Sequence, residues 1–287
     1  MDKTEKPVTT NAKKSRSYDM GNIGDLLKHG VIAEFIRWWS INQDKKNFVF
    51  LDPFCGRSYE KPNPNVIDRL ERLKELGNKR GQKFEIINAQ SNSGNCKYYG
   101  STHVALRQID SCGLLPDILI SDEKINLVNH LTKFNSNIKK IKCDNFYPSN
   151  GYSILDSINE DKIYADMVLI DPFENMEEIR QRACSIFTAS KRTAVVLFVL
   201  INDHTKWKKI QAELPKYSII LTCPRLESTK IKGESKYTVK VILASHLLAN
   251  TKDGELLEKL KSYADALTDI VNKANNESLN KKIITCE

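Results

Sequence analysis

Apolar residues gather in short runs along most of the chain, and polar turn residues separate the runs. One such run, Phe48–Leu51, leads directly into a turn that contains Asp52, Pro53 and Gly56. A buried strand that ends in an acidic residue and a glycine turn is typical of the first strand of an open α/β sheet. We therefore interpret Phe48–Leu51 as the strand around which the chain is organised.

The residues before this strand follow a helical pattern. Large apolar residues recur three and four positions apart over residues 23–39, which predicts a helix preceded by a turn at Gly21–Asn22. Asp25 falls in the first turn of that helix, where the helix dipole favours a carboxylate. Lys28 and His29 interrupt the apolar pattern together. Taken alone, they are explained by one surface lysine and one histidine with satisfied hydrogen bonds.

The rest of the chain continues as alternating strands and helices of one large α/β domain. The predicted strands are Phe84–Ala89, Asp117–Ser121, Ile138–Cys143, Ala165–Ile170, Thr193–Leu200, Tyr217–Pro224 and Tyr237–Ser245, and the last two form an antiparallel pair. The predicted helices are Val66–Leu76, Thr102–Cys112 with Ser101 as its N-cap, 124–134, Gly151–Ser157, Glu177–Thr188, Thr205–Leu214 and Gly254–Lys273.

We find no internal repeat and predict a single domain over residues 18–275. A basic, disordered tail at residues 1–17 and a polar tail at residues 276–287 flank it.

The charge of the chain favours an anionic partner. The formal net charge is +8 in 287 residues, and nucleic acid is the commonest partner of such a basic protein, although a generally lysine-rich composition would also explain the excess. One basic stretch carries two aromatic residues, a composition suited to phosphates and exposed bases. It comprises Lys206, Trp207, Lys208, Lys209, Arg225, Lys230, Lys232, Lys236 and Tyr237.

Cysteine usage and hydropathy predict a cytoplasmic protein without a membrane segment or metal site. The seven cysteines are isolated and odd in number, and none forms a Cys-x-x-Cys pair, which favours reduced thiols over disulfides or zinc. The chain has no apolar run of about 18 residues, and its N-terminus lacks the apolar region of a secretory signal.

Four predicted strands end in a carboxylate, namely Asp52, Asp122, Asp144 and Asp171. Ligands of an open parallel sheet bind outside the carboxyl ends of its strands, so four such residues predict one anionic rim. Acidic residues also cap the helices that follow strands, which would explain any one of them singly.

The absence of phosphate-binding motifs limits the classes of ligand that this site could bind. The turn at Gly56 lacks the three glycines of a dinucleotide site, which disfavours an oxidoreductase, and the chain has no P-loop. A cofactor without phosphate groups needs carboxylates for a ribose diol, an adenine amino group and an ammonium. S-adenosylmethionine meets that description.

The order of several blocks resembles a known family. YDMGNIGDLLKH, FLDPFCG, YYGSTHVA, ISDEK, CDN and LIDPFE follow one another over residues 18–250 as in the bacterial adenine-N6 methyltransferases that act on large-subunit ribosomal RNA. The chain also resembles the related three-Cys-motif partner family, which carries DPF where the methyltransferases carry DPPY. The resemblance implies a class I, Rossmann-like S-adenosylmethionine-dependent methyltransferase fold with a seven-stranded, mostly parallel sheet and helices on both faces.

The resemblance also implies roles for individual residues. His29 and Phe54 would line the cofactor pocket together with Asp52 and Gly56, and Ser101 would reach the methionine moiety. Asp122 would hold the ribose hydroxyls, and Asp144 with Asn145 would address the adenine ring. The predicted catalytic residues are Asp171, which would accept a hydrogen bond from the target amino group, Pro172, and Phe173, which would support the flipped base.

Two departures from the family pattern keep a second hypothesis open. Ser58 replaces the last glycine of the first turn, and Asp171-Pro172-Phe173-Glu174 replaces the DPPY motif. The first hypothesis is methylation of adenine N6 in nucleic acid, with RNA favoured over DNA. The second is a binding module with the same fold, which has little or no turnover and serves as a partner in a larger assembly.

Overall fold

The computed structural model describes most of the chain and leaves gaps between the described segments. The described residues are 21–56, 59–60, 64–91, 98–122, 129, 138–140, 151–160, 162–171, 176–201, 204–214, 217–224, 238–250 and 254–284.

A seven-stranded sheet in the order β5-β4-β1-β6-β7-β9-β8 forms the centre of the molecule. The first five strands in this order run parallel, and β9 is antiparallel to both of its neighbours. The strands are β1 (Asn47–Asp52), β4 (Leu115–Ile120), β5 (Ile138–Lys140), β6 (Met167–Ile170), β7 (Ala194–Ile201), β8 (Ser218–Pro224) and β9 (Thr238–Ala244). A separate antiparallel pair joins β2 (Tyr59–Glu60) to β3 (Tyr98–Tyr99).

This strand order confirms the predicted class I methyltransferase fold. A doubly wound sheet places its strands in the order 3-2-1-4-5-6, and here the antiparallel β9 is inserted between the fifth and sixth strands. The order in which strands are added to the sheet reverses at β1, because β4 and β5 lie on one side of it and β6 and β7 lie on the other. This places the switch point of the topology at the strand that the sequence identified as central.

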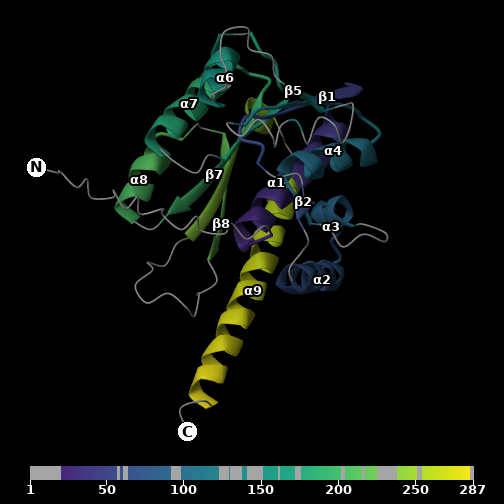
Figure 1. The fold of residues 1–287 in the computed structure, drawn as a ribbon, viewed down its shortest axis with the longest axis vertical. Coiled ribbons are helices and arrows are strands. Elements are labelled where there is room, and N and C mark those ends of the chain that lie inside the picture. The colour runs from purple at the N-terminus through teal and green to yellow at the C-terminus, as the bar shows by residue number, and fades with distance from the viewer. Residues whose placement is uncertain are drawn as a thin grey trace, which may run out of the picture.

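Helices cover both faces of the sheet (Figure 1). On one face lie α1 (Ile23–Asn42), α2 (Pro64–Lys79), α3 (Glu85–Gln90), α4 (Ser101–Ser111) and α9 (Glu255–Ile284). On the other lie α6 (Gly151–Asn159), α7 (Met176–Ala189) and α8 (His204–Ala212), and the short 3-10 helix η1 (His246–Asn250) follows β9.

The strands alternate between two hydrophobic cores, as a sheet covered on both faces requires. In β1, Phe48 and Phe50 join the core beneath α1, while Val49 and Leu51 join the core beneath α6 and α7. Because every side chain of β1 after Asn47 is buried, this strand reads in the sequence as a continuous apolar run rather than an alternating one.

Helix α1 is buried along most of its length, between the sheet, α4 and α9. Its N-cap is Asn22, whose side-chain Oδ1 accepts hydrogen bonds from the backbone N–H groups of Gly24 and Asp25 at 2.8 and 3.1 Å. The preceding Gly21 has φ +85°, a left-handed conformation that favours glycine. The predicted turn and helix start are therefore confirmed.

Residues 84–89 were predicted as a strand, and this prediction is wrong because Glu85–Gln90 forms helix α3. The buried residues Ile86 and Ala89 lie three positions apart on one face of α3. The carboxylate of Glu34 in α1 accepts the backbone N–H of Glu85 at 2.8 Å and so satisfies one N–H group of the first turn. A six-residue apolar run does not distinguish a strand from a buried helix, so tertiary contacts decide.

Two helix ends also differ from the prediction. The N-cap of α4 is Gly100, and Ser101 is instead the first helical residue. Helix α9 continues to Ile284 rather than ending near Lys273. The predicted helix at 124–134 and the end of the strand predicted at Ile138–Cys143 lie outside the described residues, apart from residue 129.

Close packing of α9 on α1 depends on Gly30. A Cβ atom added at Gly30 would lie 2.1 Å from the ring of Tyr263, whose hydroxyl donates a hydrogen bond to the carbonyl of Leu26 at 2.5 Å. We expect Gly30→Ala to lower the free energy of unfolding by about 1–3 kcal/mol, as for other overpacked interiors. Chemical denaturation would measure this change.

A matched control for that variant is Gly254→Ala, because nothing lies within 4 Å of a Cβ atom added at Gly254. Equal stability of the two variants would contradict the proposed contact.

Candidate functional site

Three of the four predicted strand-end carboxylates lie at neighbouring strands. Asp52 ends β1, and Asp122 and Asp171 follow β4 and β6, the two strands that flank β1. The backbone ties the first two ends together, because Ser121 N–H donates to the carbonyl of Asp52 at 3.0 Å. The structure therefore brings three members of the predicted rim to one edge of the sheet.

The turn after β1 is fixed against the end of β4. The backbone N–H of Gly56 donates to Asp122 Oδ2 at 3.1 Å, and that of Cys55 donates to the carbonyl of Ser121 at 3.0 Å. Gly56 has φ +57°. A side chain at this position would be strained, which explains why the turn needs a glycine here even without a phosphate ligand.

Asp52 is a buried carboxylate with one oxygen that has no hydrogen-bond partner. Its Oδ2 accepts a hydrogen bond from the Thr102 hydroxyl at 3.0 Å, while Oδ1 has no partner among the described residues. Burial raises the pKa of Asp52 to about 7, and the Thr102 hydroxyl and the Lys28 ammonium offset only part of that effect. An unsatisfied buried oxygen is costly, and a ligand that donates to it would remove the cost.

Lys28 is buried and pairs with two carboxylates. Its Nζ lies 3.2 Å from Asp25 Oδ1 and forms a second, short ion pair with Asp171 Oδ2. The ammonium also lies 5.3 Å from the ring centroid of Phe198. Burial raises the pKa of Asp171, whereas the Lys28 charge lowers it and so favours the ionised carboxylate.

His29 is buried, and both of its ring nitrogens contact protein atoms. Nδ1 lies 2.9 Å from the Tyr98 hydroxyl and 3.4 Å from Gln90 Nε2, and Nε2 lies 3.1 Å from the Ser101 hydroxyl. Burial, reinforced by the neighbouring Lys28 charge, lowers the pKa of His29 to about 3. The imidazole is therefore neutral at physiological pH and connects Ser101 to the β2–β3 segment.

Phe54 packs away from His29, on the other face of the sheet. Its ring meets Tyr152 edge-on with the centroids 5.5 Å apart, and a Cβ atom added at Gly151 would lie 2.4 Å from it. The side chain is part of the core beneath α6 and is only partly exposed.

Several predicted site residues lie outside the described residues. They are Asp144 and Asn145 of the predicted adenine contact, and Pro172 and Phe173 of the predicted catalytic motif. Ser58, which departs from the family pattern in the first turn, also lies outside the described residues. In the basic stretch, Lys208 and Lys209 are exposed on α8. Trp207 is buried at 9% exposure, with Lys240 Nζ 4.3 Å from its ring centroid, so it presents no free ring to a base. Arg225, Lys230, Lys232, Lys236 and Tyr237 are not described.

Sequence reasoning missed the supporting residues of the site. Lys28 was explained as a surface lysine but is buried, and Thr102, Tyr98 and Gln90 were not singled out. One signal could have identified Lys28: it sits within an apolar helical pattern, three residues after Asp25, where a charge requires a partner. The contacts of Gln90 and Tyr98 depend on folding and leave no comparable signal.

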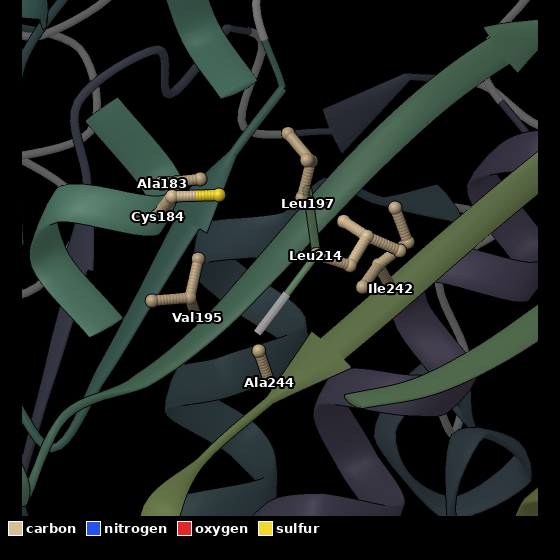
Figure 2. Close-up of a pocket in the computed structure, with 7 residues that line it drawn as sticks. All are labelled: Ala183, Cys184, Val195, Leu197, Leu214, Ile242 and Ala244. Atoms are coloured by element: carbon tan, nitrogen blue, oxygen red, sulfur yellow. The ribbon is translucent and has the colours of Figure 1, made fainter. Parts of the chain in front are cut away.

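A separate hollow lies on the face that α7 and α8 cover, and Figure 2 shows that aliphatic side chains and one cysteine line it. The residues that line it are Ala183, Cys184, Val195, Leu197, Leu214, Ile242 and Ala244. It offers no charged side chain to a ligand, so it does not compete with the strand-end site as a cofactor pocket.

Within the part of the chain that the structure describes, no cluster of three or more metal-ligating side chains occurs. None of the described helices is both long and apolar enough to cross a membrane.

The sheet topology defines a class I methyltransferase-like fold, and three carboxylates lie at the carboxyl edge of its sheet. No protein-family model matches the chain, and no curated protein matches it. The structure is similar to the crystal structure of protein LPL1258 from Legionella pneumophila, described under family DUF519, with a TM-score of 0.61 and 15% identity over 87% of this chain and 94% of that chain. At this identity the likeness concerns the fold alone.

Two further solved structures overlap less well. The precorrin-6y C5,15-methyltransferase of Geobacter metallireducens gives a TM-score of 0.33 at 9% identity, over 73% of this chain and 87% of that one. A Listeria monocytogenes protein, provisionally described as a class I S-adenosylmethionine-dependent methyltransferase, gives 0.36 at 13% identity, over 84% and 70%. Neither overlap is close enough to support an argument about this chain.

The raised pKa of Asp52 predicts a specific pH dependence of stability. Its pKa is about 7 in the folded state against an ordinary value of 3.8, so the folded state holds an extra proton between these values. The free energy of unfolding contributed by Asp52 is therefore greatest at low pH and is lost as the pH rises toward 7. We expect Asp52→Asn to reduce the loss of stability between pH 5 and pH 8 by roughly 1–3 kcal/mol.

Denaturation with urea at both pH values would measure this effect. Asp68→Asn, which changes a carboxylate that is 55% exposed, is the matched control and should leave the difference between the two pH values unchanged. If Asp52→Asn showed the same pH dependence as the native chain, the buried carboxyl would not titrate as described.

Proposed function

We propose that this chain is an S-adenosylmethionine-dependent methyltransferase that modifies the N6 amino group of adenine in nucleic acid, RNA rather than DNA. The observation that carries the proposal is Asp52 Oδ1, which is buried at the carboxyl edge of the sheet beside the N-terminus of α4 and has no hydrogen-bond partner among the described residues. A buried carboxylate beside the positive end of a helix is suited to a zwitterion, which carries one positive and one negative group.

The amino-acid end of the cofactor fits these groups. The Asp52 carboxylate would accept hydrogen bonds from the ammonium, and Ser101 and the positive end of α4 would receive the carboxylate. A hydrogen bond to a charged group contributes roughly 1.5–3 kcal/mol. His29, through its contact with Ser101, would support this subsite rather than bind the cofactor by itself.

The remaining cofactor contacts follow the order of the strands. Asp122 follows β4 and accepts a hydrogen bond from the backbone N–H of Gly56, and it would also accept hydrogen bonds from the ribose hydroxyls. Asp144 and Asn145, after the next strand along the sheet, would address the adenine ring, and Phe54 would lie beside it. Together these residues would recognise a nucleoside that carries no phosphate.

The target amine would lie near Asp171. When bound, the cofactor supplies a methyl group on a sulfonium sulfur. Asp171 would accept an N–H of the target amine, and the Lys28 ammonium would offset part of the effect of burial, which raises the pKa of that carboxyl group. Pro172 would shape the motif and Phe173 would stack on the flipped base.

Nucleic acid as the substrate rests on charge. The chain carries a net charge of +8, and Lys208 and Lys209 are exposed on α8. Phosphate contacts from such residues attract a polyanion without selecting a sequence.

The Lys28–Asp171 ion pair favours a second candidate function. A carboxylate that is already paired with a buried ammonium is less available to a substrate amine. With the altered DPPY motif, this arrangement suits a methyltransferase fold that binds cofactor or nucleic acid as a partner in a larger assembly.

Cofactor binding and methyl transfer can be tested separately. We expect calorimetry to detect S-adenosylmethionine binding to the native chain and to Asp171→Ala. Transfer of tritium from labelled cofactor to RNA should fall by roughly 10²–10⁴-fold in Asp171→Ala, the usual scale for a positioned proton acceptor. Asp171→Asn, of nearly the same shape, should lose as much.

The control is Asp269→Ala, which removes a carboxylate that is 57% exposed and pairs with Arg80, far along the chain from the rim. Binding without transfer to RNA or DNA would reject the enzyme in favour of the partner subunit. Absence of cofactor binding by the folded protein would reject the proposed function altogether.

The nucleic-acid surface makes a further prediction. Replacing Lys208 and Lys209 by glutamine should weaken RNA binding and reduce the slope of log affinity against log salt by about 1–1.5, since each phosphate contact on a single strand contributes about 0.7. Fluorescence anisotropy over a salt series would measure it. Lys74→Gln with Lys79→Gln removes equal charge from exposed positions on α2, on the opposite face of the sheet, and should change the slope less. Equal effects of the two pairs would contradict a surface at α8.

A further inference from the structure

We propose that His29 is a positioning residue that sets the direction of one hydrogen bond in the cofactor site. Gln90 and Tyr98 hold its imidazole in the tautomer protonated on Nε2, and that tautomer turns the hydroxyl hydrogen of Ser101 outward to an anionic acceptor. The acceptor is the methionine carboxylate of the cofactor, and this identification rests on the proposed function. The tautomer does not depend on it.

The orientation of the Gln90 side-chain amide is determined by two hydrogen bonds to the backbone of Tyr99. The backbone N–H of Tyr99 donates to Gln90 Oε1 at 2.9 Å, and Gln90 Nε2 donates to the backbone carbonyl of Tyr99 at 2.9 Å. If the amide oxygen and nitrogen were exchanged, the Gln90 NH₂ group would face the Tyr99 N–H and the Gln90 oxygen would face the Tyr99 carbonyl. Both contacts would then be repulsive. Nε2 is therefore the end of Gln90 that lies near His29.

This orientation determines which nitrogen of His29 accepts. Gln90 Nε2 can only donate, and it lies 3.4 Å from His29 Nδ1. The Tyr98 hydroxyl lies 2.9 Å from the same nitrogen and can donate to it as well. A proton on Nδ1 would oppose the Gln90 N–H, so Nδ1 carries the lone pair.

The ring carries a single proton. Burial and the adjacent Lys28 ammonium disfavour the imidazolium, and the pKa of His29 is lowered to about 3. With Nδ1 unprotonated, the proton of the neutral ring is on Nε2. Nε2–H then donates to the Ser101 hydroxyl oxygen 3.1 Å away.

The tautomer of His29 determines the direction of the hydrogen bond that the Ser101 hydroxyl donates. Its oxygen accepts from His29, so its own hydrogen must be donated elsewhere, and the described residues contain no other hydrogen bond of this hydroxyl. Ser101 is the first residue of the eleven-residue helix α4, where the backbone favours a negative charge. A donor fixed at that point selects a carboxylate over an ammonium.

The tautomer can be read directly from the free protein. In protein labelled with ¹⁵N-histidine, and with the His29 signals assigned by their loss in His29→Gln, we expect an unprotonated Nδ1 and a protonated Nε2 that stay unchanged from pH 5 to pH 8. A protonated Nδ1, or an imidazolium within this range, would overturn the inference whether or not the cofactor binds.

A binding cycle tests the effect on the ligand. The probes are S-adenosylhomocysteine, which carries the same amino acid as the cofactor, and its decarboxylated analogue, each titrated by calorimetry. Ser101→Ala and His29→Leu should each weaken the binding of S-adenosylhomocysteine by roughly tenfold to a hundredfold. They should change the affinity of the decarboxylated analogue less than threefold. His29→Gln, which keeps an N–H donor toward Ser101, should recover part of the loss.

Ser111→Ala, at the other end of α4, is the matched control and should alter neither affinity. Equal weakening of both ligands by His29→Leu would show a merely structural role and overturn the inference. Tyr98→Phe removes one of the two donors to His29 Nδ1 at modest risk to folding. A shift of the His29 ¹⁵N signals of this variant toward a mixture of tautomers would support the inference. If the native chain shows the expected tautomer but binds neither probe, the proposed function fails and the carboxylate assignment fails with it.

Discussion

The site depends on one buried ammonium. Lys28 lies within α1, where the surrounding residues are apolar, and its charge is balanced by Asp25 on its own helix and Asp171 after β6. A buried charge without a partner is strongly destabilising, so this pairing fixes α1 against the carboxyl edge of the sheet. The same charge acts on its neighbours: it lowers the pKa of His29 and favours ionisation of Asp52.

Two adjacent residues of helix α1 contact different parts of the site. Lys28 reaches the strand ends, and His29 reaches Tyr98 and Ser101. Neither arrangement is favourable in isolation, because each places polar groups inside a hydrophobic core. The apolar contacts of α1 with α4, α9 and the sheet compensate for them.

Most of the fold follows from local patterns. The apolar runs of β1, β4, β6, β7, β8 and β9 are long or distinct enough to be recognised, and the helical spacing of α1 is clear. Residues 84–89 were misassigned because a run of six residues carries no reliable period, and the Glu34 contact that selects the helix comes from a distant segment. The end of α9 was missed because polar residues continue a helix without an apolar pattern.

The site was only partly predictable for a related reason. Carboxyl ends of parallel strands share one edge, so the proximity of Asp52, Asp122 and Asp171 follows from their positions after strands. The partners of these residues come from side chains that meet only after folding. Nothing local distinguishes Thr102 as the donor to Asp52, or Gln90 as a neighbour of His29.

The insertion of β9 between β7 and β8 has a consequence for biosynthesis. Within the described sheet, β7 and β8 do not pair with each other, and each forms its ladder on that side only with β9. A nascent chain that has left the ribosome as far as Pro224 therefore exposes two strands whose common neighbour has not yet emerged. The β7–β9–β8 part of the sheet can form only when residues 238–244 emerge, so β8 and one edge of β7 stay open to premature strand pairing until translation is nearly complete.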